Sequence, residues 1–183
     1  MKALIIVSCF MSLCFVLSVQ RKDDREVSVE TTAEGITHLS GSVSIRAAKD
    51  SIWSLLAGYD RLCDFVPNLK ESRIIKSDSS GIALYQRGTG GFWIFTRTVE
   101  TVLIVRETYP VSIDFRQIKG DFKYFRGSWR IGEAAGGGIC TVRYDAEMIP
   151  SFRAPNFVIQ RIQKKMLSEL LEIIRMRLES NSK

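Results

Sequence analysis

The sequence predicts an α+β domain, with one curved antiparallel sheet and a long C-terminal helix across its concave side. Several segments alternate apolar and polar residues and are separated by turn-forming residues, which is typical of consecutive antiparallel strands. From Pro155 to Ser180, apolar residues recur at spacings of three and four, as on one face of a helix. A curved sheet crossed by a single helix leaves space between the two layers.

Regular structure is expected from Thr37 onward. Every second residue of Leu39–Ile45 is apolar or glycine, which predicts a strand with one buried face. The apolar residues of Ile52–Leu56 favour a short helix. Tyr59–Phe65 favours a second helical piece, which ends before Pro67 because a residue preceding proline is pushed out of the α region.

Six more strands follow, separated by segments rich in glycine and serine. Ser77–Gly81, Gly88–Gly91 and Ala135–Gly138 have the composition of turns. The expected strands are Leu69–Lys76, Ile82–Arg87, Phe92–Glu107, Ser112–Lys119, Tyr124–Ile131 and Cys140–Ile149.

The last predicted element is a helix over Pro155–Ser180, about 39 Å long at ~1.5 Å per residue. Proline is tolerated in the first turn of a helix. The apolar stripe expected to face the sheet consists of Ile159, Ile162, Met166, Leu170, Ile173 and Ile174, widened by Leu167, Leu171 and Leu178.

Length and composition indicate one globular domain. The chain has 183 residues, 45% of them hydrophobic and 25% charged, which excludes an intrinsically disordered chain. Its net charge of +6 would attract polyanions. The basic residues are spread along the chain and form no long run, so no specific nucleic-acid partner is expected.

The first 20 residues differ from the rest. Lys2 precedes the uncharged stretch Ala3–Val19, a pattern typical of a secretory signal peptide. A retained membrane anchor is the alternative, although the stretch is short for a span. The expected organisation is a leader at 1–20, a polar N-terminal segment at 21–36 and the folded domain at 37–180.

Cys63 and Cys140 are the cysteines outside the leader. Two cysteines make no disulfide framework. One bridge or two buried free thiols are both open, and free thiols are the preferred interpretation.

The residue inventory offers no recognisable catalytic device, metal site or cofactor motif. His38 is the only histidine, and neither an HExxH nor a CxxC motif is present. Asp114, Asp145 and Glu147 are expected on the solvated face of their strands, as paired surface charges. No catalytic residue, metal ligand or cofactor is therefore assigned, and an enzymatic role is not the favoured one.

Aromatic residues are concentrated in the second half of the predicted sheet. Nine of the 18 aromatic residues fall between Phe92 and Trp129. Such residues fill a core or line an apolar pocket, and both interpretations stay open. Arginines in the same strands are mostly expected to face water, although one turned inward would anchor a ligand oxygen.

The last sequence signal consists of Ile45–Leu56, Tyr59–Leu62, Phe65–Ser72, Gly120–Trp129 and Tyr144–Pro150, followed by Pro155 and the long helix. These segments resemble the START-like polyketide cyclase/dehydrase and coenzyme Q-binding family, most closely its branch in plants, algae and cyanobacteria. The chain departs from plant relatives in its leader, since those carry longer, polar transit segments. We therefore expect a secretory or membrane-associated location, with a plastid as the alternative.

The resemblance implies a helix-grip fold with a cavity for a lipid, an isoprenoid quinone or a polyketide-like molecule. We expect a binding or transport protein for such a molecule, with contact to a membrane surface as a further expectation. A cyclase or dehydratase and a ligand-free interaction module are the alternatives. The predicted ligand-binding residues are Trp53, Phe65, Pro67, Trp93, Phe95, Phe115, Phe125, Trp129, Tyr144, Ile162, Met166 and Leu170.

Overall fold

The computed structural model describes residues 25–92, 95–133, 138–151 and 155–180, with residues 90–92, 95 and 96 as backbone only. The predicted leader at 1–20 lies outside these residues. The elements follow in the order β1 (Glu26–Thr31), β2 (Thr37–Ile45), α1 (Lys49–Leu56), a 3-10 helix η1 (Tyr59–Asp64), β3 (Leu69–Asp78), β4 (Gly81–Phe92), β5 (Phe95–Thr108), β6 (Ser112–Gly120), β7 (Phe122–Glu133), β8 (Cys140–Pro150) and α2 (Asn156–Ser180).

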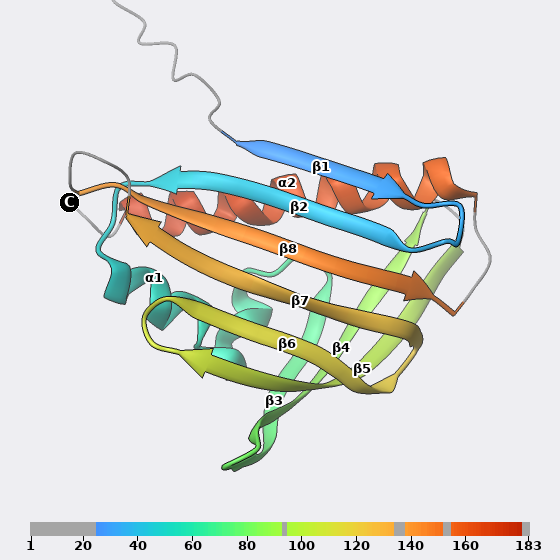
Figure 1. The fold of residues 1–183 in the computed structure, drawn as a ribbon, viewed down its shortest axis with the longest axis horizontal. Helices are drawn as coiled ribbons and strands as arrows, with labels where there is room; N and C mark the ends of the chain where they lie inside the picture. The colour runs from blue at the N-terminus through green and yellow to red at the C-terminus, as the bar shows by residue number, and fades with distance from the viewer. Residues whose placement is uncertain (1–24, 93–94, 134–137, 152–154, 181–183) are drawn as a thin grey trace, which may run out of the picture.

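The strands form one antiparallel sheet in the order β1-β2-β8-β7-β6-β5-β4-β3. α2 packs against β1 and β2 and also contacts β4, close to the opposite edge, so the sheet must curve around the helix. Figure 1 shows α2 behind β1 and β2 in this view. α1 contacts both α2 and β7, so the two helices lie on the same side of the sheet. We call this side the inner face and the opposite side the outer face. The predicted α+β helix-grip fold is confirmed.

The sheet begins earlier in the chain than the sequence suggested. Residues 21–36 were expected as a polar segment before the fold, yet β1 lies within it and pairs with β2 along its whole length. Val27 and Val29 on β1 pack against the core. Arg25, next to β1, lies 3.4 Å from Glu172 of α2, which also pairs with Arg175 at 2.7 Å. A strand with two inward valines has too short a periodic pattern to stand out without its partners.

The expected turn at Gly88–Gly91 is wrong, because these residues continue β4. Gly88 lies opposite Val99 and Gly91 opposite Thr96, so the hairpin closes only between Phe92 and Phe95. A Cβ at Gly88 would lie 2.9 Å from the carbonyl oxygen of Asn68. Glycine is therefore needed here for close backbone approach rather than for a turn.

The apolar stripe of α2 faces the sheet, but its centre is rotated from the predicted position. The residues expected to widen the stripe are buried, together with two of its predicted members: Leu167, Leu171 and Leu178, with Ile159 and Ile174. The other predicted members, Ile162, Met166, Leu170 and Ile173, are only half-buried. The rotation follows from β2, where a Cβ at Gly41 would lie 2.9 Å from Leu171 Cδ1 and 3.0 Å from Leu167 Cδ2. The absence of a side chain at Gly41 lets these two leucines approach the strand.

The structure shows the state of the two cysteines and the character of the helices. Cys63 is half-buried, Cys140 is buried, and both are free thiols, as the preferred interpretation held. No helix in the described part of the chain combines the length and apolar character that a membrane span requires.

The orientation of α2 predicts unequal costs for two truncations on the same helix. Leu171 is 0% exposed, so Leu171→Ala should lower the free energy of unfolding by about 2–5 kcal/mol. Met166→Ala should cost clearly less, because Met166 is half-buried. Urea denaturation of both variants measures the two costs. An equal or larger loss for Met166→Ala would contradict the orientation described here.

Candidate functional site

The main candidate site is a chain of aromatic side chains on the inner face. Consecutive ring centroids lie 5.1 Å apart for Phe122 and Phe125, 5.3 Å for Phe125 and Phe115, 6.1 Å for Phe115 and Tyr144, and 4.6 Å for Tyr144 and Trp129. These separations are typical of interacting aromatic pairs. The rings come from β6, β7 and β8 and form a continuous surface, which we call the aromatic wall.

Strand register places the aromatic wall on the inner face. Phe125 lies opposite the buried Met148, and Trp129 lies opposite Tyr144. Each of the five rings packs against the core but stays only half-buried. The wall therefore belongs to the core on one side and remains accessible on the other.

The half-buried residues of α2 lie on the helix that packs against the same inner face. Leu170 and Ile173 pack against the core from the helix side, while Ile162 and Met166 are half-buried on the same helix. The fully buried leucines of α2 contact β2, near one edge of the sheet. As a result, α2 covers β1 and β2 closely and leaves the aromatic wall incompletely covered.

Two polar groups occupy one cross-strand row of this inner face. The row runs from Tyr144 on β8 through Trp129 and Ile113 to Glu107 on β5. Glu107 accepts a hydrogen bond of 2.5 Å from the hydroxyl of the buried Tyr59 on η1. Tyr144 makes no hydrogen bond to a residue that the structure describes. Burial raises the pKa of Tyr144, and burial followed by the contact with Glu107 raises the pKa of Tyr59.

The structure unites part of the predicted ligand-binding set. Phe115, Phe125, Trp129 and Tyr144 form the aromatic wall, and Ile162, Met166 and Leu170 lie half-buried on α2.

The other predicted residues lie elsewhere or outside the description. Trp53 is buried and makes an edge-to-face contact with Tyr109 at 5.3 Å. Phe65 is buried beneath the guanidinium of Arg177, and Pro67 is half-buried in the turn before β3. Trp93 and the side chain of Phe95 lie outside the described residues.

Sequence reasoning missed Phe122 and the Tyr59–Glu107 pair. Strict alternation would put Phe122 and Phe125 on opposite faces, but an irregularity in the β7–β8 register between Phe122 and Tyr124 brings both to the inner face. A bulge of this kind leaves no clear mark in the sequence. The partner of Tyr59 depends on how η1 lies against β5, which local patterns do not encode.

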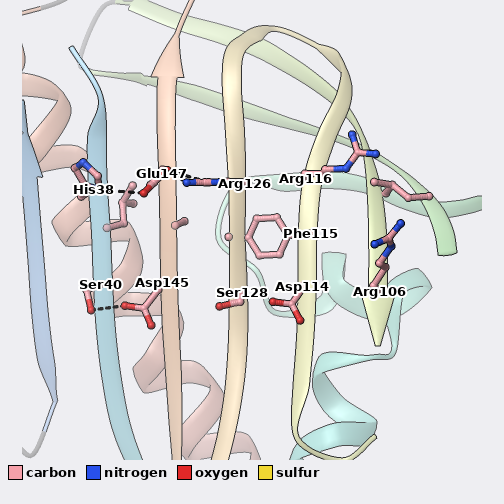
Figure 2. Close-up of a pocket in the computed structure, with 14 residues that line it drawn as sticks. His38, Ser40, Arg106, Asp114, Phe115, Arg116, Arg126, Ser128, Asp145 and Glu147 are labelled. Carbon is pink, nitrogen blue, oxygen red and sulfur yellow. Dashed lines mark hydrogen bonds and ion pairs between the residues drawn. The ribbon is translucent and has the colours of Figure 1, made fainter. Parts of the chain in front are cut away.

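A second candidate is a groove of about 550 Å³ on the outer face. Figure 2 shows its polar residues on β2, β8, β7, β6 and β5. Asp114, Asp145 and Glu147 line it, which agrees with their predicted place on the solvated face. His38 also lines it and lies 3.6 Å from Glu147.

Most charges of the outer groove neutralise one another. Arg126 pairs with Glu147 at 2.8 Å, Arg130 with Asp114 at 2.9 Å and Arg143 with Asp145 at 2.8 Å. Arg106 and Arg116 have no ion pair among the described residues, and Figure 2 shows both on the β5 side of the groove. The groove is thus a solvated surface on which most charged side chains form ion pairs. Its two arginines without an ion pair among the described residues could bind an anion.

Neither candidate contains an obvious metal site. Within the described residues, no group of three or more histidine, cysteine, aspartate or glutamate side chains is arranged to hold a metal ion. The chemistry on offer near the aromatic wall is therefore apolar contact, hydrogen bonding by tyrosine and the carboxylate of Glu107, which is engaged by Tyr59.

Comparison with known proteins gives a family match and structural neighbours. The family model described as "Polyketide cyclase / dehydrase and lipid transport" matches residues 45–175. No curated protein matches the chain.

Three solved structures illustrate the fold. A START superfamily protein from Mycobacterium smegmatis has 16% identity over 78% of this chain and 97% of its own, with a TM-score of 0.66. A STAR-related lipid transfer protein from Xanthomonas axonopodis has 16% identity over 84% and 98%, with a TM-score of 0.61. The Zhui aromatase/cyclase from Streptomyces has 14% identity over 81% and 96%, with a TM-score of 0.56.

The raised pKa of Tyr59 predicts a loss of stability in alkali. The unfolded chain releases the phenol proton near pH 10, whereas the folded protein holds it, so stability present below pH 10 is lost as pH rises. Between pH 10 and 11, wild type should lose about 1 kcal/mol more unfolding free energy than Tyr59→Phe. Denaturant unfolding at both pH values measures this difference. Parallel losses in the two proteins would show that Tyr59 does not carry the effect.

Proposed function

Since this chain belongs to the polyketide cyclase/dehydrase and lipid transport family, we propose that it binds an apolar small molecule between the inner face of the sheet and α2. The observation that carries the proposal is the aromatic wall, whose five rings stay half-buried on the face that carries the helices. A lipid, an isoprenoid quinone or a polyketide-like molecule has the matching chemistry. Among these, an isoprenoid quinone is our preferred ligand.

The half-buried state of the wall supports binding over mere core filling. Aromatic side chains each bring a large apolar surface, and a contiguous exposed apolar patch commonly marks an interaction site. Strand register places the wall on the inner face, which is also the side that α2 packs against. An apolar molecule placed there would remove the accessible parts of both from water.

The expected driving force is sufficient for useful affinity. An isoprenoid tail that removes ~400 Å² of apolar surface from water would gain about 10 kcal/mol before the costs of ordering. Micromolar binding requires about 8 kcal/mol. Affinity in this range therefore fits a carrier that must also release its ligand.

An enzyme acting on a bound polyketide or isoprenoid is the second candidate, supported by the inward Glu107 and Tyr144. Three strand spacings separate their positions along the row, about 14 Å along the sheet. Glu107 is already engaged by Tyr59. Because acid–base partners must reach the same reacting group, this spacing favours the carrier. Mass spectrometry of the ligand after incubation separates the two functions, since a carrier returns it unchanged.

Tryptophan fluorescence during titration with quinones tests the proposed binding. Quenching should saturate and should strengthen from a quinone without a tail to one with a long isoprenoid tail, because the tail supplies the apolar area. Trp129→Phe should remove much of the quenching while preserving affinity in a dye-displacement assay. Quenching that does not saturate, or that ignores tail length, would contradict the proposal.

Two variants on α2 serve as a matched pair in the same titration. Leu170→Glu places a charge beside the inner space and should weaken binding at least tenfold. Met176→Glu adds the same charge at an exposed position of the same helix and should leave affinity unchanged. Equal affinities in both folded variants would exclude the α2 stripe from the site.

The location of the protein stays a prediction. A secretory or membrane-associated location, or alternatively a plastid, is proposed from the apolar leader. A fluorescent reporter behind residues 1–30 should enter a membrane system, and a diffuse cytosolic signal would contradict this. Contact of the folded domain with a membrane surface is proposed from Arg106 and Arg116, and co-sedimentation with anionic vesicles measures it.

A further inference from the structure

Tyr144 differs from Tyr59, Tyr109 and Tyr124 because its hydroxyl has no hydrogen-bond partner among the residues that the structure describes. Tyr109 donates to Asp50 at 2.7 Å, Tyr59 donates to Glu107, and Tyr124 donates to Glu147 at 3.3 Å. The hydroxyl of Tyr144 makes no hydrogen bond within the described residues. The ring is nevertheless held firmly, between Trp129 at 4.6 Å and Phe115 at 6.1 Å.

This difference limits what can bind beside Tyr144. Its hydroxyl is not among the fully enclosed polar atoms that lack a partner in the described part of the chain. Covering it without giving it a new hydrogen bond would cost free energy. Tyr144 is half-buried, so a bound molecule can still reach part of its surface. A ligand that lies on the aromatic wall would cover this hydroxyl and would have to satisfy it.

We propose that Tyr144 donates a hydrogen bond to a neutral oxygen of the ligand, so that the ligand is an apolar molecule carrying a carbonyl group. This inference rests on the proposed binding at the inner face and adds the chemistry of the ligand's polar end. A ketone or quinone fits this description, and a plain hydrocarbon does not. Burial raises the pKa of Tyr144, so the phenol keeps its proton and acts as a donor at neutral pH.

The surroundings favour a neutral oxygen over a carboxylate. The rings in contact with Tyr144 are those of Trp129 and Phe115, which carry no charge. A carboxylate brought against them would lose its hydration without gaining a cation from these neighbours. A carbonyl needs only the one donor that Tyr144 supplies.

The test compares two ligands that differ only in their oxygens, an alkyl-1,4-benzoquinone and the benzene that carries the same alkyl chain. Displacement of a bound apolar fluorophore gives both affinities without relying on quenching. In wild type, the quinone should bind roughly threefold to tenfold more tightly than the alkylbenzene, the usual worth of one hydrogen bond. In Tyr144→Phe, this ratio should fall to near one while the alkylbenzene keeps its affinity.

Tyr124→Phe is the matched control, because it removes a hydroxyl that is bonded to Glu147 on the outer face. It should keep the wild-type ratio. Thermal melting should show that both variants remain folded. A Tyr144→Phe variant that keeps the wild-type ratio, or that weakens both ligands equally, would overturn the role of the hydroxyl while leaving apolar binding intact. Folded wild type that binds neither ligand would overturn the proposed function itself.

Discussion

The contact between α2 and β2 through Gly41 determines how the rest of the inner face is arranged. Leu167 and Leu171 lie where a side chain at Gly41 would be, so the helix settles against β2 and β1 at one end of the sheet. The antiparallel sheet then curves until β4 also reaches the helix. Because one helix cannot cover eight strands evenly, the middle of the inner face keeps less cover than its edge.

The aromatic wall is the consequence of this uneven cover. Its rings lie on β6, β7 and β8, beyond the strands on which α2 rests. Aromatic side chains suit such a position, because their size lets them pack against the core while keeping one side accessible. The closely packed leucines give the domain stability, and the looser region beside them keeps an accessible apolar surface.

On the outer face, charged side chains on neighbouring strands determine the character of the surface. Its arginines and carboxylates stand on neighbouring strands and pair across the sheet, as Arg126 does with Glu147. Such exposed pairs contribute little to stability, but they keep the solvated face polar and discourage unwanted association. The groove on this side is therefore a less suitable place for an apolar molecule than the inner face, although its arginines Arg106 and Arg116 could meet an anionic surface.

Several features of the candidate site were predictable from the sequence, and others were not. Phe115, Phe125, Trp129 and Tyr144 were expected on strands, because alternation and aromatic density are visible locally. Their place near a cavity was an expectation from the family resemblance. Phe122 was missed because a register irregularity brings it to the inner face. The sequence did not show which apolar residues of α2 are buried and which are half-buried, because both groups are apolar. The distinction depends on Gly41 of β2, against which Leu167 and Leu171 pack.

The sequence by itself determined the type, order and approximate limits of most strands and of α2, because a residue's neighbours two or four positions away set these periodicities. Only the tertiary structure decided the pairing of β1, the extended course of Gly88–Gly91 and the lack of a partner for the Tyr144 hydroxyl among the described residues. Each of these depends on residues distant in the chain, and therefore on register and curvature. Local periodicity carries no information about which distant groups will meet.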